Sequence, residues 1–423
     1  MREMKDSGIE WIGAIPQDWQ LSKIGSLYTQ RNEKVSDKDY QPLSVTMQGI
    51  LPQLATAAKT DDGDNRKLVR VGDFAINSRS DRRGSCGISP LDGSVSLINI
   101  ILTPRTAMHP GYYNWLFHTT LFADEFYKWG HGIVADLWTT RWQEMKSITV
   151  PVPEYAEQER IAAFLDAECA EIDAVLEKTR ASIEEYKKLK QAVITQAVTK
   201  GIRGDRPMKD SGIEWIGEIP AEWEIRKIFR AINKVGDIDH YMPDSVDDGI
   251  PYLMTGDLQE KLSDVNLKRC KKVSFQDYEM LSSKIRVSKG DVIFARYATI
   301  GTVCFVDTED NILVSYACLI IKPNSSLLYG EFLFYYLKST AFLEEIKQYI
   351  KANTQANVGL DSVSKAKIAL PSVHEQQKIV EYLRDKCKKI DALIAKKQQY
   401  ITEIENYKKS LIYEYVTGKK EVV

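Results

Sequence analysis

The sequence lacks the residue patterns of the common metal sites and disulfide scaffolds. Its six cysteines are spread over 423 residues and none belongs to a Cys-x-x-Cys pair, which excludes a zinc ribbon and a disulfide framework. The five histidines form neither His-x-x-x-His nor His-Glu-x-x-His, so no ligand set for metal-dependent hydrolysis is visible. We therefore expect no metal site in this chain.

Motifs of the common enzyme classes are absent as well. The chain has no Gly-x-x-x-x-Gly-Lys-Ser/Thr loop for nucleotide phosphates, no Gly-x-Gly-x-x-Gly dinucleotide loop and no Gly-x-Ser-x-Gly elbow. It has no Asn/Asp-Pro-Pro-Tyr motif of an amino-methyltransferase, and no Asp/Glu-x-Lys follows Pro243-Asp244 at nuclease spacing. We expect neither catalytic residues nor a bound cofactor in this chain.

Long apolar runs and a strong charge imbalance are also missing. No stretch approaches the roughly 18–20 apolar residues of a membrane span, and the first residues lack the apolar region of a signal peptide. The formal net charge of −2 excludes the bulk electrostatic attraction of histone-like proteins for nucleic acid. The sequence therefore predicts a cytoplasmic globular protein with no membrane partner, whose nucleic-acid binding, if any, comes from local patches.

Two internal repeats organise the chain. Residues 4–24 return as residues 208–228 with 15 identities in 21 positions, and both copies contain Ser-Gly-Ile-Glu-Trp-Ile-Gly-x-Ile-Pro-x-x-Trp. A second repeat places Pro-x-x-x-Glu-Gln at Pro153 and again at Pro371, an offset of 218 residues. The chain is therefore two copies of one unit, for which pseudo-twofold symmetry is the natural arrangement.

Each copy ends in a stretch without glycine or proline, at residues 154–200 and 372–417, which predicts one long helix per copy. Apolar residues recur at alternating steps of four and three, which is typical of a coiled-coil seam. The predicted seam residues are Leu165, Cys169, Ile172, Leu176, Ile183, Leu383, Cys387, Ile390, Ile394, Ile401 and Ile404. We expect the two helices to pair with each other in antiparallel orientation.

Polar residues interrupt this seam in the same layers of both helices, at Thr179 with Lys397 and at Lys190 with Lys408. The Tyr-Lys-Lys triplets of the two helices are 221 residues apart, so aligning them would slip the seam by three residues. We therefore prefer the ungapped register. The charge runs on the outer faces indicate either a solvated surface or a docking surface for a partner.

The middle of each copy is rich in short strands punctuated by Gly and Asp. The expected strands are Leu43–Thr46, Asp73–Asn77, Val95–Leu102, Asp291–Arg296, Thr302–Val306 and Leu313–Ile321. One aromatic helix follows in each copy, at residues 112–117 and 332–337, and its rings are expected in the core rather than as platforms for stacked bases.

The predicted fold class is therefore α+β, with two α+β domains joined by two long antiparallel coiled-coil helices in a pseudo-twofold internal repeat. The N-terminal segment and first α+β domain are expected at residues 1–152, the central long helix at 153–204, the second α+β domain at 205–370 and the C-terminal long helix at 371–423. The first long helix runs directly into the second Trp-containing segment. By symmetry, the end of the second helix should lie beside the first such segment.

Arginine clusters occupy corresponding loops of the two α+β domains. Arg79, Arg82 and Arg83 follow the strand opened by Gly72-Asp73, and Arg296-Tyr297 follows the strand opened by Gly290-Asp291. Arginine at such a loop suits a bidentate contact with guanine or a contact with phosphate, although a solvated turn would have the same spacing. A basic run of Lys268, Arg269, Lys271 and Lys272 would suit a row of phosphate contacts.

The two repeats together resemble the specificity subunits of type I restriction–modification enzymes. The resemblance rests on the Trp-containing motif before each α+β domain and the Pro-x-x-x-Glu-Gln motif that opens the long helix after it, and it covers both halves of the chain. It implies that the α+β domains are target recognition domains for the two parts of a bipartite DNA sequence, and that the helices form a spacer. It also implies double-stranded DNA, two methyltransferase subunits and restriction/translocase subunits as partners, with S-adenosylmethionine, ATP and Mg bound by those partners.

This resemblance suggests further residues at the DNA groove. The expected contacts are Thr46 and Gln48 with Thr255, together with two loops before the long helices that contain His131 and Asn353, Gln355 and Asn357. Asn and Gln can bind adenine through two hydrogen bonds, but the same residues also form capping turns.

Two other functions remain open at this point. A self-contained DNA modification or cleavage enzyme would need a methyl-donor or metal site that the sequence does not contain. A coiled-coil adaptor without DNA contact would not lose a sequence preference when its α+β domains are exchanged.

Overall fold

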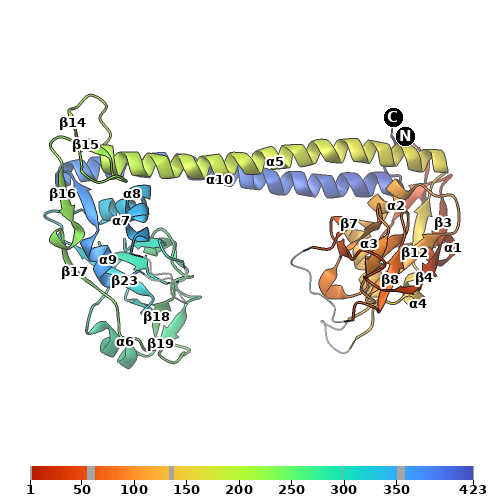
Figure 1. Ribbon diagram of the computed structural model, residues 1–423, viewed down its shortest axis with the longest axis horizontal. Helices are drawn as coiled ribbons and strands as arrows, with labels where there is room; N and C mark the ends of the chain where they lie inside the picture. Colours follow the sequence, from red (N-terminus) through yellow and green to blue (C-terminus); the bar gives the residue numbers. More distant parts are fainter. Residues whose placement is uncertain (1, 55–61, 133–137, 298, 350–357, 423) are drawn as a thin grey trace. The chain divides into compact units, whose positions relative to one another are not determined.

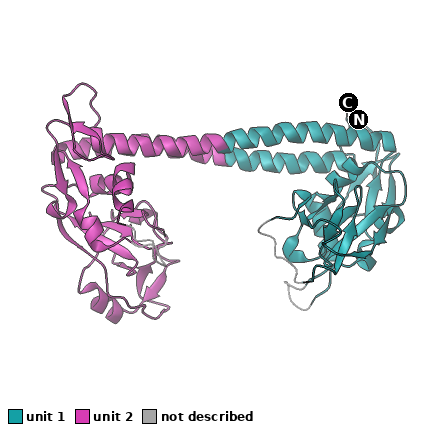
Figure 2. Cartoon of the chain, viewed as in Figure 1, with its two compact units in different colours: residues 1–180, 399–423 teal, residues 181–398 magenta. Residues whose placement is uncertain are grey.

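The computed structural model describes residues 2–54, 62–132, 138–297, 299–349 and 358–422. The chain divides into two compact units, residues 1–180 with 399–423 and residues 181–398 (Figure 2). Each unit combines one α+β body with a segment of both long helices. The predicted division at residues 152, 204 and 370 follows the sequence repeats instead, and it stays a prediction. Within the described ranges, no helix has the length and apolar character needed to span a bilayer.

The α+β body of unit 1 contains a four-stranded sheet in the order β10-β9-β12-β4, a three-stranded sheet in the order β11-β8-β5, and three separate strand pairs, β1-β2, β3-β13 and β6-β7. Its strands are β1 (Met4–Asp6), β2 (Ala14–Pro16), β3 (Gln20–Lys23), β4 (Tyr28–Arg31), β5 (Lys34–Val35), β6 (Leu43–Thr46), β7 (Gly49–Pro52), β8 (Arg66–Val69), β9 (Phe74–Asn77), β10 (Cys86–Ile88), β11 (Gly93–Val95), β12 (Asn99–Pro104) and β13 (Thr149–Val152). Its helices are α1 (Ile24–Leu27), η1 (Ser80–Arg82), α2 (Pro110–Phe117), α3 (Thr120–Lys128) and α4 (Trp142–Met145).

The body of unit 2 repeats the four-stranded sheet in the order β17-β23-β20-β21 and has a three-stranded sheet in the order β19-β18-β22. Its strands are β14 (Met208–Asp210), β15 (Glu218–Pro220), β16 (Glu224–Lys227), β17 (Ile232–Gly236), β18 (Ile250–Leu253), β19 (Lys271–Val273), β20 (Val292–Ala295), β21 (Val303–Phe305), β22 (Leu313–Val314), β23 (Cys318–Pro323) and β24 (Lys367–Leu370). Its helices are η3 (Ile228–Arg230), η4 (Leu262–Asp264), α6 (Phe275–Ser282), α7 (Gly330–Lys338), α8 (Thr340–Lys347) and α9 (Leu360–Lys365).

Two predictions of a single continuous strand are wrong, because the structure has two strands in each place. The expected strand Val95–Leu102 is divided between β11 and β12, and the expected strand Leu313–Ile321 between β22 and β23. In each case the chain leaves the three-stranded sheet and enters the four-stranded sheet. A turn makes this change, with the backbone N–H of Asn99 donating to the Ser96 carbonyl and that of Cys318 to the Ser315 carbonyl. The other four predicted strands are confirmed to within one residue at either end.

The two long helices are α5 (Tyr155–Lys200) and α10 (Val373–Val416) (Figure 1). Contacts between them run in opposite directions along the two sequences. In unit 1, Phe164 packs on Tyr415 and Arg180 pairs with Glu405, whereas in unit 2 Lys190 pairs with Asp391. All eleven predicted seam residues are buried or half-buried, so the antiparallel coiled coil is confirmed in both units.

Two of the four polar residues in the seam, Lys190 and Lys408, form equivalent ion pairs in the two units. Lys190 lies 2.8 Å from Asp391 in unit 2, and the equivalent Lys408 lies 2.6 Å from Asp173 in unit 1. The ungapped register is also confirmed, because Tyr186 is half-buried in the seam while Tyr407 is 51% exposed. Burial raises the pKa of the seam thiols Cys169 and Cys387 to about 11, so both are protonated at neutral pH.

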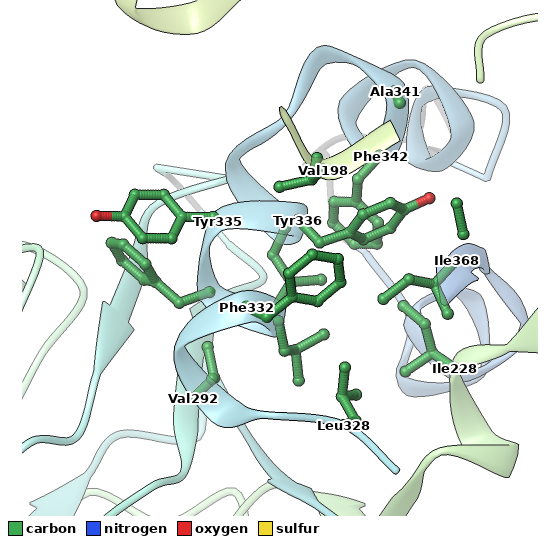
Figure 3. Close-up of a cluster of buried hydrophobic side chains, with 14 of the residues drawn as sticks. Val198, Ile228, Val292, Leu328, Phe332, Tyr335, Tyr336, Ala341, Phe342 and Ile368 are labelled. Atoms are coloured by element: carbon green, nitrogen blue, oxygen red, sulfur yellow. The ribbon is translucent and has the colours of Figure 1, made fainter. Parts of the chain in front are cut away.

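Each α+β body packs its aromatic helix against the long helices of its own unit. All of residues 332–337 in α7 are buried, and Figure 3 shows Phe332 and Tyr336 in one cluster with Val198 of α5 and Ile368 of β24. In α2 of unit 1, four side chains are buried in the equivalent cluster with Leu165 of α5. The prediction that these aromatic side chains form core is therefore confirmed.

The start of each long helix is joined to the Trp-containing segment by one glutamate. The Trp19 indole donates to Glu157 at 2.9 Å, and the Arg2 guanidinium pairs with the same carboxylate and lies over the indole ring. In unit 2, the equivalent residues Trp223, Arg206 and Glu375 make the same three contacts, with the indole bond at 3.1 Å.

The following glutamine joins the helix to the α+β body. In unit 1, the Gln158 side chain accepts from the His109 backbone N–H at 2.9 Å, directly before α2, and donates to the Pro153 carbonyl at 2.8 Å. In unit 2, Gln376 accepts from the Tyr329 N–H at 2.7 Å, directly before α7, and donates to two carbonyls. Arg2, Trp19, Glu157 and Gln158, with their equivalents in unit 2, are called the helix-start junction below.

The end of α10 lies beside the N-terminal segment, as the repeat predicts (Figure 1). The Tyr413 hydroxyl donates to the Ile12 carbonyl at 2.9 Å, and the Lys419 ammonium donates to the Ala14 carbonyl at 3.1 Å. In unit 2 the end of α5 meets the second segment in the same way, with Gly201 against Trp223. Gly201 and Gly418 both end their helices at positive φ, +75° and +69°, where glycine is the favoured residue.

Candidate nucleic-acid interface

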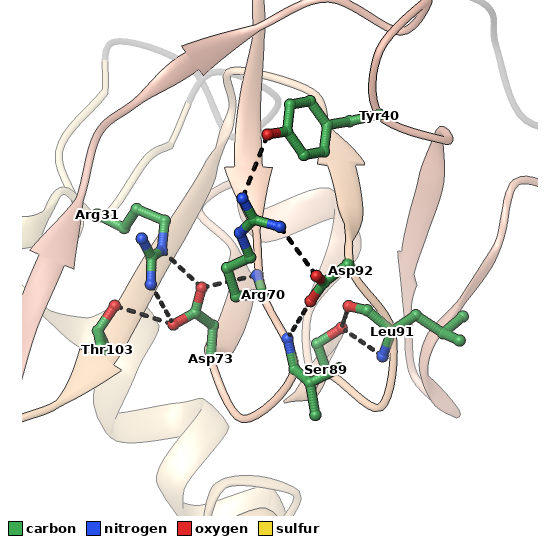
Figure 4. Close-up of polar contacts among 9 residues, drawn as sticks. Arg31, Tyr40, Arg70, Asp73, Ser89, Leu91, Asp92 and Thr103 are labelled. Atoms are coloured by element: carbon green, nitrogen blue, oxygen red, sulfur yellow. Dashed lines mark hydrogen bonds and ion pairs between the residues drawn. The ribbon is translucent and has the colours of Figure 1, made fainter.

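A buried aspartate fixes the start of the strand that leads to each arginine loop. In unit 1, the Asp73 carboxylate accepts hydrogen bonds from Arg31 at 2.7 Å, Thr103 at 2.9 Å and the Arg70 backbone N–H at 2.9 Å (Figure 4). The hydrogen bond from Arg31 to Asp73 raises the pKa of that guanidinium. Gly72 precedes the aspartate at a φ of +86°, so β9 begins from a tightly held turn.

The same turn recurs in unit 2. Asp291 accepts from Lys322 at 2.6 Å and from the Ser288 backbone N–H at 2.8 Å, and Gly290 has a φ of +90°. Burial raises the pKa of Asp291, while Lys322 opposes this shift. The two arginine loops therefore leave equivalent strands, β9 and β20, at the ends away from these turns.

The arginine loop of unit 1 presents its cations to solvent. Arg79 is exposed directly after β9, and Arg82 is exposed beside Asp81. Arg83 pairs with Asp124 and lies over the Tyr127 ring, so it also holds the loop against α3.

The arginine loop of unit 2 is held differently. The Arg296 guanidinium lies 2.5 Å from Asp237 and 5.0 Å from the centre of the Tyr297 ring, and only 14% of its side chain is exposed. Asp237 follows β17, and Lys284 also lies 3.8 Å from it. Sequence reasoning missed Asp237, because no local spacing links a residue after β17 to one 59 positions later.

The predicted contacts before these loops lie at two turns. Thr46 closes the β6-β7 hairpin by donating to the Gly49 carbonyl at 2.9 Å, and Gln48 is exposed at its tip. Thr255 is half-buried in the turn after β18, between Met254 and Asp257, whose backbone groups are bonded to each other. The two turns differ in form, and the predicted DNA contacts at them stay a prediction.

The basic run of unit 2 is divided between surface and internal contacts. Lys268 and Arg269 are exposed, whereas Lys271 donates to the Pro243 carbonyl and lies over the Tyr252 ring. Lys272 lies 3.6 Å from Asp248. The run does not form one continuous row of free cations, because its last two members belong to β19 and fasten the segment before β18.

His131 is 77% exposed, and its imidazole lies 3.9 Å from Glu144. The rest of its loop from residue 133, and Asn353, Gln355 and Asn357, lie outside the described residues. Among the residues that are described, no group of three or more His, Cys, Asp or Glu side chains could hold a metal ion.

Comparisons with known proteins identify a family whose members resemble this chain. A family model described as "Type I restriction modification DNA specificity domain" matches residues 220–406. The MjaVIII specificity subunit of Methanocaldococcus jannaschii is 24% identical over 431 aligned positions, which cover 96% of this chain and 94% of that protein. Over nearly its whole length, the chain is similar to the specificity subunits of type I restriction enzymes. The predicted resemblance is thereby confirmed.

Two further comparisons extend this similarity. The EcoBI specificity subunit of Escherichia coli is 22% identical over 282 residues, and the match covers 65% of this chain but 59% of that protein. A chain in a solved structure of the type I R-M system has a TM-score of 0.72 and 14% identity, with 96% of this chain and 99% of that chain covered. This last likeness supports the fold class. Specificity subunits recognise DNA sequence and are non-catalytic, which argues against the self-contained enzyme.

We predict that Arg296 reads a base through its fixed guanidinium. Arg296→Ala should relax one position of the DNA target and cost about 1–3 kcal/mol in binding to that target. Arg296→Lys keeps the charge but not the two-pronged donor geometry, so it should lose the same base preference. Competition binding with single-base variants of the target measures both, with Arg230→Ala, an exposed arginine of η3, as the control. Retention of every base preference in a folded Arg296→Ala protein would contradict this role.

Proposed function

We propose that this specificity subunit selects a bipartite DNA target for a type I restriction–modification complex. Unit 1 reads one half of the target and unit 2 reads the other. The long helices carry two methyltransferase subunits, through which restriction/translocase subunits join. In this proposal, those partner subunits bind S-adenosylmethionine, ATP and Mg. The complex acts in the cytoplasm, where its DNA target is found.

The observation that carries the proposal is a constant frame with different reading loops. The helix-start junction repeats contact by contact in the two units, and the turns at Asp73 and Asp291 share the hydrogen bond from the backbone N–H three residues earlier. The elements around the arginine loops do not repeat. Unit 1 has the β6-β7 hairpin, whereas unit 2 has α6 and a loop arginine paired with Asp237. Two readers on one frame, each with its own contacts, suit two different half-sites.

An exchange of one α+β body tests this proposal. Residues 25–150 are replaced by the corresponding body of a relative with a different target, and the methylated motif is read by sequencing the DNA of a host that also carries the methyltransferase subunit. Only one half of the motif should change, because each body has its own core. The matched control replaces residues 229–366 and should change only the other half. A change of both halves after either exchange would refute independent reading.

Support for partner docking comes from the two flanks of the coiled coil. The residues that directly follow alternate seam positions are mostly charged or ion-paired, as with Arg180 and Glu405 at 2.6 Å. The residues that directly precede the other seam positions include polar ones, such as Glu168, Ser182 and Lys386, and five apolar ones that are 39–51% exposed. These five are Val175 and Leu189 on α5 and Leu393, Tyr400 and Tyr407 on α10, at multiples of seven residues within each helix. These five residues, called the apolar stripe below, give one flank of the coiled coil exposed apolar surface in both units, which suits a protein partner.

We predict that this apolar stripe binds the methyltransferase subunits, one in each unit. The double variant Leu189→Asp/Leu393→Asp in unit 2 should leave a complex with one methyltransferase subunit instead of two, because charge replaces apolar contact area worth on the order of 100-fold in affinity. Native mass spectrometry of the reconstituted complex measures the stoichiometry. The control is Glu184→Gln/Lys388→Gln, on exposed positions of the same helices outside the stripe. Two bound methyltransferase subunits in the first variant, with its helices intact by circular dichroism, would contradict docking on this flank.

A further inference from the structure

A cavity of about 370 Å³ opens beside Arg79 in unit 1. Three cationic side chains line it, from three separate segments: Lys67 on β8, Arg79 after β9 and Arg141 before α4. The amide of Gln30 on β4 also faces the cavity, and Leu97 and Trp142 contribute to its apolar wall. No Asp or Glu belongs to its lining.

The three cations have no counter-charge in the part of the chain that the structure describes. None of them appears in an ion pair there. Lys67 donates to the Asn99 carbonyl at 2.6 Å, and burial lowers the pKa of its ammonium. Lys34 stands directly opposite Lys67 in the strand pair β5-β8 and adds a further positive charge. Lys67 is half-buried and would normally be paired, whereas Arg79 and Arg141 are exposed, so that three positive charges surround one cavity and favour an anion between them.

The neighbouring carboxylate of Glu144 does not supply this charge. One Glu144 oxygen accepts the Arg141 backbone N–H at 3.0 Å, and the other lies 3.9 Å from His131. Glu144 is not part of the cavity lining. Within residues 62–132 and 138–297, no carboxylate pairs with these three cations, and a bound anion would satisfy them.

The apolar wall identifies the anion as part of a larger molecule. Leu97 and Ile98 are 38% and 36% exposed beside the cations, and Trp142 is half-buried. A free inorganic anion would leave this apolar surface in water, whereas a nucleotide unit places its phosphate on the cations and its sugar or base against the wall.

We propose that this cavity binds a backbone phosphate of the DNA target, with Lys67, Arg79 and Arg141 as its ligands. This inference rests on the proposed function, since it assumes that unit 1 reads DNA. It distinguishes the two units. The loop arginine of unit 1 shares a phosphate site, while the equivalent Arg296 is neutralised by Asp237 and held for a base. Lys67 and Arg141 are then DNA contacts that the sequence analysis did not find.

The salt dependence of binding tests this site. The full chain, assembled with its methyltransferase subunit, is titrated with labelled target DNA and with unrelated DNA at several salt concentrations. Lys67→Gln and Arg141→Gln should each weaken binding to both DNAs by on the order of tenfold, and each should reduce the slope of log K against log salt by about 0.9. Lys128→Gln removes the same charge from an exposed position of α3 outside the cavity and should change neither value.

Each outcome separates the inference from the function on which it rests. A wild-type complex without preference for its target would overturn the proposed function itself. Target preference in the wild type with unchanged slopes in both variants would overturn only the phosphate site. Loss of preference at one base with an unchanged slope would also overturn it, in favour of base reading. If Lys67→Gln fails to fold, Arg141→Gln carries the test, and Lys67→Arg should keep the wild-type slope because it retains the charge.

Discussion

The contact on which each unit depends is the Glu-Gln pair at the start of its long helix. Glu157 binds the indole and guanidinium of the Trp-containing segment, and Gln158 binds the backbone directly before α2. Glu375 and Gln376 do the same in unit 2. The first turn of the helix is thereby joined to segments 138 and 49 residues away in unit 1, and 152 and 47 residues away in unit 2. Free backbone N–H groups at a helix start already favour a carboxylate there. The reading loops can differ because this junction does not.

The seam of the coiled coil likewise depends on a small number of specific contacts. Apolar layers supply most of its stability, while Lys190 with Asp391 and Lys408 with Asp173 fix the register in equivalent layers. A slip of three residues would bury Tyr407 and separate both ion pairs. The register also determines which side chains lie on each flank of the coiled coil. The 3.5-residue period that pairs the helices therefore also exposes the apolar stripe.

The sequence was sufficient to predict the long helices and the internal symmetry. It was insufficient to predict the surface proposed to contact DNA. Gly-free stretches, a 3.5-residue period and a 15-in-21 repeat predict the helices, the seam and the symmetry, because these depend on local pattern. The breaks after β11 and β22 were missed, since both halves of each predicted strand are apolar and only the sheets they join differ. Asp237 meets Arg296 through the strand order of one sheet, and Lys67 lies near Arg79 although β8 and β9 belong to different sheets. No spacing along the chain reveals either arrangement.

The central claim is that each helix-start junction holds its own α+β body and not the other. Hydrogen exchange of the full chain, resolved by peptide, tests it with Gln158→Leu and Gln376→Leu. Each change removes the acceptor of one backbone N–H and the donor to the carbonyls that the glutamine amide contacts. The lost hydrogen bonds cost about 1–3 kcal/mol of local stability. Gln376→Leu should speed exchange in residues 327–338 only and Gln158→Leu in residues 109–117 only, while Gln377→Leu, at the exposed neighbouring position, should change neither. Equal protection in all three variants, or faster exchange in both bodies from a single change, would contradict the account.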